Sequence, residues 1–356
     1  MNVLYITVRS DFGGGPRHID QLVEWMPKDI NVFMAYPKDG CPYGLRWESN
    51  NRIKETIFIP YRKFSLKSLS KLKHFIKDNK IDIVHSHGNG AGIYSRLLKI
   101  LCPSVAVIHT FHGISDVYKS PVKYVLSLCM GTLLSPFCTK YIAVSKGEKE
   151  LSIKRHFSKE DNTLVIYNGI ENPNSKPRIK QNCPVIIVTL SRFDYQKNMD
   201  SMLRIAKMLK SCSVKFVWVG DGPDRLRLEQ QAKDWGLDIT FVGFSNEPME
   251  YLKSADWYIS TSRFEGLPYG LIEACSVGLP IIASNVKGNN EVVVNEKTGF
   301  LFREESEAVE KIRLISQNVY PYSDFSKNAI LFFKEYFTET QMIKRIVSLY
   351  FDISKS

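Results

Sequence analysis

The sequence predicts an α/β protein of two doubly wound domains, each with a parallel sheet covered by helices on both faces. Two observations predict this class. Short apolar, β-branched runs alternate with helical patterns of about 10–15 residues. A polar stretch with two prolines, E-N-P-N-S-K-P-R-I-K-Q-N, separates two such series. At 356 residues the chain has room for two cores, and we expect a crevice between the strand ends of the two domains.

The domain boundaries follow from this alternation. We place the first domain at residues 1–172, a linker at 173–182 and the second domain at 183–335. We expect a C-terminal helix over 336–356 to pack back toward the first domain.

The composition is that of a soluble globular protein, with 44% hydrophobic and 24% charged residues. The seven cysteines include no C-x-x-C pair, which favours a reducing compartment and argues against a disulfide framework or a cysteine zinc site. The opening M-N-V-L-Y-I-T-V has no basic region and predicts a first strand rather than a signal peptide.

The positive charge is concentrated in the first half. Residues 1–175 hold 24 Lys and Arg against 15 Asp and Glu, whereas the rest holds 24 against 22. Between Arg62 and Lys80 there are seven basic residues and one acid, with apolar residues at helical spacing. This pattern predicts a helix with either a solvated basic face or a patch that rests on anionic lipid headgroups. We find no nucleic-acid motif.

Strands and helices of the first half are predicted from its apolar runs. The predicted strands cover 3–8, 31–36, 55–59, 81–85, 106–110, 141–145 and 165–168. The uncharged part of 118–138 is too short to span a bilayer. We favour a buried helix there over an interfacial segment.

Two features of the first half indicate a ligand site. Gly13, Gly14 and Gly15 lie between a strand and a helix, in outline a phosphate loop, although the spacing is not G-x-G-x-x-G. His85, His87 and His112 lie at or just beyond predicted strand ends. A metal site is one interpretation, but no carboxylate accompanies them. We favour hydrogen bonding into the crevice, by His112 above all, since Gly113 permits a sharp turn.

In the second half, strands are predicted over 183–190, 216–219, 239–242, 257–260 and 280–284. The first of these strands opens into S-R-F-D-Y-Q-K-N before a helix over 199–209. Arg192 and Lys197 therefore lie at the carboxyl edge of the second sheet. Two cations there can bind a diphosphate and neutralise it as a leaving group.

The stretch E-G-L-P-Y-G-L-I-E places two carboxylates, Glu265 and Glu273, eight positions apart across a loop and the start of a helix. Free amides at a helix N-terminus, here those of residues 267–270, favour phosphate. Hydroxyls bound by the carboxylates, with a phosphate between them, describe a nucleotide sugar.

These motifs resemble those of the retaining glycosyltransferases of family 4, which have the GT-B fold of two facing Rossmann-like domains. The resemblance is strongest over 184–302. Its signature is Glu265, seven residues and Glu273; S-R-F-D-Y-Q-K-N is similar to the family's G-R-L-x-x-x-K-G, and F-H-G to its H-D/H-G element. Ser191 and Asn198 replace two usual glycines, and Gly288-Asn289 replaces a usual G-G.

The resemblance implies roles for these residues. Glu265, His112, Arg192 and Lys197 are the expected catalytic residues, with Glu265 on the donor sugar. The expected substrate-binding residues are Gly14, Gly15, Glu265, Gly266, Leu267, Pro268, Tyr269, Gly270 and Glu273, with Glu273 on the ribose. No metal or cofactor is expected, because the two cations take the place of Mg²⁺ at the diphosphate.

The implied activity is transfer of a hexose or N-acetylhexosamine, with retention, from a nucleoside-diphosphate sugar, in particular a UDP-sugar, to a saccharide acceptor. The basic first domain favours a lipid-diphosphate-linked acceptor at the cytoplasmic face of a membrane, as in O-antigen or capsule biosynthesis. Two alternatives remain open: a nucleotide-sugar epimerase of the same fold, and a nucleotide-sugar binding protein without catalysis.

Overall fold

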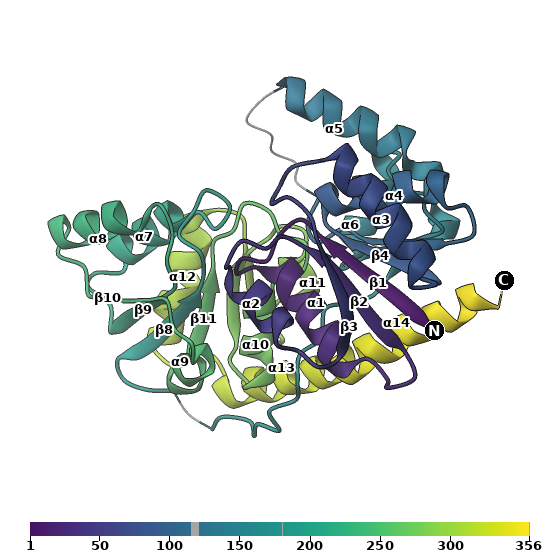
Figure 1. Ribbon diagram of the computed structural model, residues 1–356. Coiled ribbons are helices and arrows are strands. Elements are labelled where there is room, and N and C mark those ends of the chain that lie inside the picture. Colours follow the sequence, from purple (N-terminus) through teal and green to yellow (C-terminus); the bar gives the residue numbers. More distant parts are fainter. Residues whose placement is uncertain (115–120, 180, 356) are drawn as a thin grey trace. The chain divides into compact units, whose positions relative to one another are not determined.

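The computed structural model describes residues 1–114, 121–179 and 181–355 (Figure 1). The chain forms two compact units. Unit 1 comprises residues 1–168 together with 339–356, and unit 2 comprises residues 169–338. The predicted class of two doubly wound α/β domains is confirmed.

Unit 1 is built on a parallel sheet of seven strands in the order β3-β2-β1-β4-β5-β6-β7. The strands are β1 (Asn2–Thr7), β2 (Asn31–Tyr36), β3 (Ile53–Phe58), β4 (Ile83–His87), β5 (Ala106–Thr110), β6 (Lys140–Ala143) and β7 (Thr163–Val165). The helices are α1 (Gly14–Trp25), α2 (Pro42–Glu48), α3 (Leu66–Asp78), α4 (Asn89–Leu101), α5 (Pro121–Leu133), α6 (Lys146–Lys154) and α14 (Glu339–Ser354).

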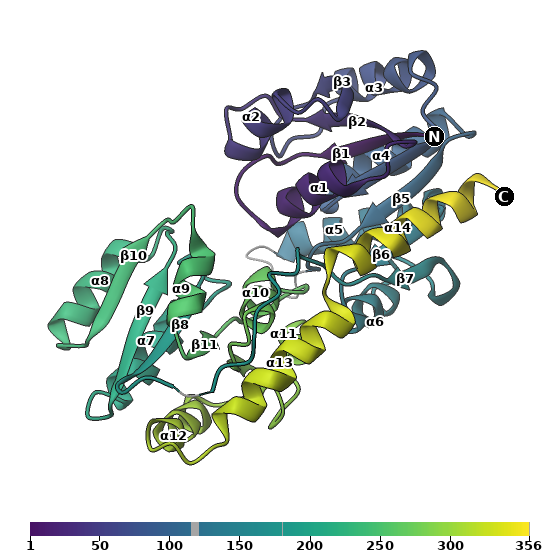
Figure 2. The same cartoon turned by 90° about the horizontal axis from the view of Figure 1, so that it is seen from below.

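Both faces of this sheet are packed, which explains why its strands are apolar without interruption. Along β1, Leu4 and Ile6 join one buried cluster, whereas Val3 and Tyr5 join the other. The second cluster includes residues of α14, among them Ile346. The last helix of the chain thus completes the core of the first sheet (Figure 2).

Unit 2 has a parallel sheet of six strands in the order β10-β9-β8-β11-β12-β13. The strands are β8 (Val185–Leu190), β9 (Val214–Val219), β10 (Ile239–Gly243), β11 (Trp257–Ser260), β12 (Ile281–Ser284) and β13 (Gly299–Phe302). The helices are α7 (Met199–Met208), α8 (Arg225–Asp234), α9 (Pro248–Ser254), α10 (Tyr269–Ser276), α11 (Asn289–Val292), α12 (Glu305–Ser316) and α13 (Tyr322–Tyr336).

Two expectations about local structure are wrong. Helix α5 is not buried: Val122, Leu126 and Leu133 are 76%, 61% and 69% exposed. Among its described residues, Gly131 lies against Phe157, and Leu128 packs partly buried against the core of unit 1. Residues 115–120 of the predicted segment lie outside the described residues.

The second correction concerns β4, which extends to His87 rather than ending at His85. Histidine is a weak strand signal, but these two side chains are buried and bonded inside the unit. Within the described ranges, no helix combines the length and apolar character that a membrane span requires.

Candidate active site

The candidate donor site of unit 2 lies where the strand order of its sheet reverses. Strand β8 has β9 on one side and β11 on the other. In doubly wound sheets, ligands bind beyond the carboxyl ends of the strands at such a switch point. The loops that leave β8 and β11 there are residues 191–198 and 261–268, which contain the predicted residues Arg192, Lys197 and Glu265.

The backbone of the loop after β8 packs closely against two glycines that follow β9. A Cβ on Gly222 would lie 2.4 Å from the carbonyl oxygen of Phe193, and one on Gly220 only 1.8 Å from that of Ser191. Both glycines therefore allow a backbone approach that no other residue permits. Phe193 itself is fully buried and anchors the loop in the core of unit 2.

The two loops are joined by a partly buried ion pair. The Nζ atom of Lys197 lies 2.6 Å from Oε1 of Glu265, and Nε2 of Gln196 donates to Oε2 of the same carboxylate at 3.3 Å. Glu265 is only 6% exposed. The hydroxyl of Thr261 also donates to the carbonyl oxygens of Lys197 and Asn198. The structure thus brings Lys197 and Glu265 into direct contact, which the sequence alone did not indicate.

Arg192 lies on the same loop but has a different partner. Its guanidinium is 2.8 Å from the carboxylate of Asp194, and its side chain is half exposed. A half-exposed guanidinium and a partly buried ammonium can bind the two phosphates of a diphosphate in different ways. The two cations are therefore placed on one short loop, each balanced by its own carboxylate.

Helix α10 begins at Tyr269, three residues after Gly266. Pro268 is its N-cap residue in extended conformation, and Leu267 and Tyr269 are buried. A Cβ on Gly270 would lie 2.5 Å from the Tyr258 hydroxyl.

Glu273, one turn into α10, is 5% exposed. Glu265 thus lies in the loop before α10, and Glu273 lies about one turn inside the helix.

The loop after β12 packs against the loop that precedes α10. Gly288 has a φ of +87°, and a Cβ there would lie 2.5 Å from the carbonyl oxygen of Gly266. Asn289, which departs from the family's G-G, is buried and donates from Nδ2 to the carbonyl oxygen of Ser284. The departure therefore preserves the glycine at the position of closest approach.

In unit 1, the strand order reverses between β1 and β4. Gly13 is the N-cap of α1, and Gly14 and Gly15 already lie in the helix rather than in a loop. The expectation of a three-glycine loop is therefore wrong. The position where Gly15 would carry Cβ is 3.7 Å from Cδ2 of His112, so the start of the helix lies beside the histidine ring.

The turn after His112 is held by a carboxylate that sequence reasoning missed. His112 has a φ of +61°. The amides of Gly113 and Ile114 donate to Oε1 of Glu148, and that of Val144 donates to Oε2. Glu148 is fully buried in the first turn of α6. The S-K-G-E sequence after β6 is a capping signal, but it does not reveal this contact with another loop.

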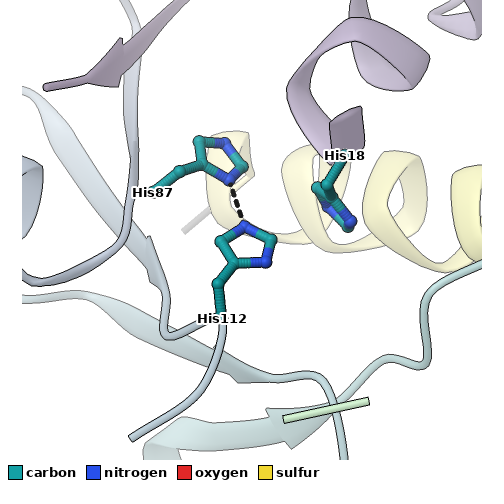
Figure 3. Close-up of side chains that lie close together, drawn as sticks. All are labelled: His18, His87 and His112. Carbon is teal, nitrogen blue, oxygen red and sulfur yellow. Dashed lines mark hydrogen bonds between the residues drawn. The ribbon is translucent and has the colours of Figure 1, made fainter. Parts of the chain in front are cut away.

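Three histidines converge beside these elements (Figure 3). His87 Nδ1 and His112 Nε2 are 3.0 Å apart, and the His18 ring packs edge-on against His112. His18 was not among the predicted residues, because an isolated histidine in a helix carries no motif. His85 points elsewhere and bonds Tyr350 and Thr110.

Burial keeps these histidines neutral. It lowers the pKa of His18 to about 4, against a small opposing effect of its bond to Asn168. The pKa values of His87 and His112 fall well below the ordinary value, first through burial and then through repulsion by neighbouring histidines. At neutral pH each ring therefore has one nitrogen that donates a hydrogen bond and one that accepts.

Two family patterns match nearly the whole chain. The pattern described as Glycosyltransferase Family 4 matches residues 12–172, and that described as Glycosyl transferases group 1 matches residues 171–332. The boundary between them falls close to the boundary between the two units.

Similar proteins include an Escherichia coli UDP-Gal:alpha-D-GlcNAc-diphosphoundecaprenol alpha-1,3-galactosyltransferase. It is 32% identical over 257 residues, which are 66% of this chain and 66% of that protein. The capsular polysaccharide biosynthesis glycosyltransferase CapH of Staphylococcus aureus is 29% identical over 311 residues, 82% of this chain and 83% of the relative.

Solved structures share the fold. Anabaena HepE in complex with UDP superimposes with a TM-score of 0.82 at 18% identity, over 98% of this chain and 99% of that one. The lipopolysaccharide outer core galactosyltransferase WaaB gives 0.79 at 17% identity, over 99% of both chains. With both halves matched in sequence and both sheets matched in structure, the chain belongs to glycosyltransferase family 4 and is a retaining glycosyltransferase of the GT-B fold.

Proposed function

We propose that this enzyme transfers a hexose or N-acetylhexosamine from a UDP-sugar to a lipid-diphosphate-linked saccharide in O-antigen or capsule biosynthesis. The observation that carries the donor site is the contact between Lys197 and Glu265 at the switch point of unit 2. In this pair a cation, which can bind a phosphate, is in direct contact with a carboxylate, which can accept hydrogen bonds from sugar hydroxyls. A nucleotide sugar presents both groups.

The proposed roles follow from these positions. Arg192 and Lys197 bind the diphosphate and stabilise the charge that develops as it leaves. Once the diphosphate takes Lys197 as a partner, the Glu265 carboxylate is free to accept hydrogen bonds from sugar hydroxyls. Glu273 accepts from the ribose, and the amides of residues 267–270 face phosphate.

His112 acts on the transferred sugar as a neutral imidazole, and the glycine-bearing start of α1 contacts phosphate or acceptor. The departing phosphate accepts the proton of the attacking acceptor hydroxyl on the same face of the sugar, which retains the anomeric configuration. Because both charges on the diphosphate are met by side chains, we expect transfer to proceed in the presence of a chelator.

The choice of nucleotide and acceptor is supported by the relatives. The E. coli relative is by name a UDP-Gal enzyme that acts on a GlcNAc-diphosphoundecaprenol. HepE was also solved with UDP-glucose. HepE shares this chain's fold and the E. coli relative is similar to it in sequence, and UDP-sugar donors have the diphosphate that two loop cations suit.

A thermal-shift and transfer experiment tests the proposal. UDP-galactose, UDP-glucose and UDP-N-acetylglucosamine are compared with GDP-mannose, since a ligand of the native state raises the melting temperature. Transfer is then measured to a polyprenyl-diphosphate N-acetylglucosamine. We expect Arg192→Ala to reduce turnover by about 10²-fold or more, while Lys253→Ala, an exposed cation on α9, retains it.

The same assay separates the alternatives. An epimerase converts the nucleotide sugar without acceptor, and a binding protein shows a thermal shift without any product. Either result, or full turnover by Arg192→Ala, would refute the proposed transfer.

We further propose that unit 1 binds the inner face of the cytoplasmic membrane through residues 61–80. Lys67, Lys71, Lys73 and Lys77 are exposed along α3. Phe64 and Leu66, just before them, are 45% and 74% exposed. Exposed lysines beside exposed apolar side chains match an anionic bilayer surface, with about 1 kcal/mol for each basic residue near it.

Vesicle flotation tests this contact. We expect the protein to float with phosphatidylglycerol vesicles and not with phosphatidylcholine alone. Lys71→Glu/Lys77→Glu is expected to abolish flotation, while the matched reversal of two exposed lysines on unit 2, Lys215→Glu/Lys233→Glu, retains it. Equal flotation of the two double variants would remove the basis for this membrane contact.

A further inference from the structure

We propose that His18, His87 and His112 form a binding site for a divalent transition-metal ion, with Zn²⁺ as the best-matched ion. One ring nitrogen from each histidine lies within 4.8 Å of those of the other two (Figure 3). The three side chains come from α1, from the end of β4 and from the turn after β5, so the tertiary fold alone assembles them.

The distance between two of these rings is close to that of ligands on one ion. His87 Nδ1 and His112 Nε2 are 3.0 Å apart. Two nitrogens bound to a tetrahedral zinc at about 2.0–2.1 Å are separated by roughly 3.3 Å. In the metal-free protein a single proton lies between these nitrogens, and an ion would replace that proton with little movement of either ring.

The third histidine is oriented as metal ligands usually are. His18 Nδ1 is 3.1 Å from the side-chain oxygen of Asn168, to which it donates its hydrogen. Such a partner fixes the tautomer and leaves the lone pair on the other nitrogen. That nitrogen, Nε2, is buried and has no hydrogen-bond partner among the described residues.

His87 also has one buried nitrogen that is not satisfied. Its Nε2 is also buried and, within the described ranges, also lacks a partner. Leaving a buried polar atom unsatisfied costs about 1–3 kcal/mol, and two such atoms occur within one cluster of rings. A bound ion removes the cost at His18 Nε2, which becomes a ligand, whereas His87 binds through Nδ1 and its Nε2 is unchanged.

The donor set selects the class of ion. Neutral imidazoles suit zinc, copper, nickel and cobalt, whereas calcium and magnesium require oxygen ligands. The cluster contains no carboxylate. Three histidines leave the fourth position of a tetrahedral ion open to water.

Metal uptake is measured on the full chain with Zn²⁺ by calorimetry and with Co²⁺ by visible absorption. We expect one ion per chain and a tetrahedral cobalt spectrum without thiolate charge-transfer bands, which separates the histidines from the seven cysteines. His18→Ala and His112→Ala are each expected to weaken binding by about 10²-fold or more. Asn168→Ala, which loses only the orienting contact, is expected to weaken it by about 10–100-fold.

The matched control is His74→Ala, an exposed histidine on α3, which should bind as the wild type does. If His18→Ala fails to fold, His18→Gln preserves a polar side chain there and is expected to lose the ion equally. Wild-type affinity in either folded His18 variant, or a cobalt spectrum dominated by thiolate bands, would overturn the site.

One consequence rests on the proposed function. An ion on His112 occupies the imidazole that we assign to the transferred sugar, so Zn²⁺ should inhibit transfer and a chelator should restore it. Zinc binding without inhibition would contradict the role of His112 in transfer, while leaving the metal site itself intact.

Discussion

Lys197 and Glu265 are the residues on which the donor site depends, and their contact has a cost. Breaking a buried ion pair from one side leaves a charge without a partner, whereas replacing both members is often nearly neutral. We expect Lys197→Met and Glu265→Gln each to lower the free energy of unfolding by about 2–3 kcal/mol, below the fully buried case because Lys197 keeps a fifth of its side chain exposed.

The double variant Lys197→Met/Glu265→Gln should regain most of this loss, as measured by urea unfolding. It should still fail to transfer sugar, because both proposed substrate contacts are gone. Additive losses in the double variant would show that the two side chains do not stabilise each other in solution.

His18 predicts a pH dependence of stability. Its pKa is about 4 in the folded protein and about 6.5 when unfolded. Because the folded pKa is the lower one, the unfolded state binds more protons between pH 6.5 and 4, so stability is full above that window and falls with pH inside it. The loss for this one residue reaches on the order of 3 kcal/mol.

Urea unfolding at pH 7 and pH 5 measures this effect. From pH 7 to pH 5, the free energy of unfolding of His18→Gln should fall by about 2 kcal/mol less than that of the wild type. That of His74→Gln should fall by the same amount as that of the wild type. An identical loss in all three proteins would mean that His18 is already protonated in the folded state at pH 5.

At the scale of elements, helix α10 is positioned by its contact with β11. Gly270→Ala would place a methyl group 2.5 Å from the Tyr258 hydroxyl, which bonds both the amide and the carbonyl of Leu190 at the end of β8. We expect a loss of about 1–3 kcal/mol from this overpacking. A displaced Tyr258 should also displace Leu190 and the loop that follows it, residues 191–198. The affinity for UDP should therefore fall as well.

Tyr258→Phe removes the oxygen that causes this clash. In the Gly270→Ala/Tyr258→Phe double variant, the loss should be smaller than the sum of the two single losses. Thermal unfolding with and without UDP measures both effects, and strictly additive losses would show that the helix moves away without cost.

At the scale of the whole molecule, α14 joins the two ends of the chain in one core. Met342, Ile346, Leu349 and Tyr350 are buried against the first sheet, and the Tyr350 hydroxyl contacts His85 and Tyr5. Burial of each such side chain contributes about 1.5–3 kcal/mol, so together they rival the stability of a typical domain.

We therefore expect a chain that ends at Thr338 to lose the cooperative melting of unit 1, while unit 2 keeps its own transition. Removing only Lys355 and Ser356 is the control. Calorimetry and circular dichroism distinguish the two, and an unchanged melting profile after the longer truncation would refute the dependence of unit 1 on α14.

The sequence by itself determined where the strands lie and which loops carry chemistry. Strands such as β8 are apolar without interruption because both faces are covered, and Gly, Pro and charged residues mark the loops after them. These signals are local, so Arg192, Lys197, Glu265 and Glu273 could be proposed as site residues from the sequence, and the two-domain class follows from the alternation of patterns.

Tertiary structure alone decided which of these residues meet. Lys197 reaches Glu265 because β8 and β11 are neighbours in the sheet although they are far apart in sequence. His18, Glu148 and Tyr350 carry no local signal, and the exposure of α5 depends on what packs against it. Contacts between distant segments are set by strand order and by the fit of whole cores, neither of which is encoded in a short stretch of residues.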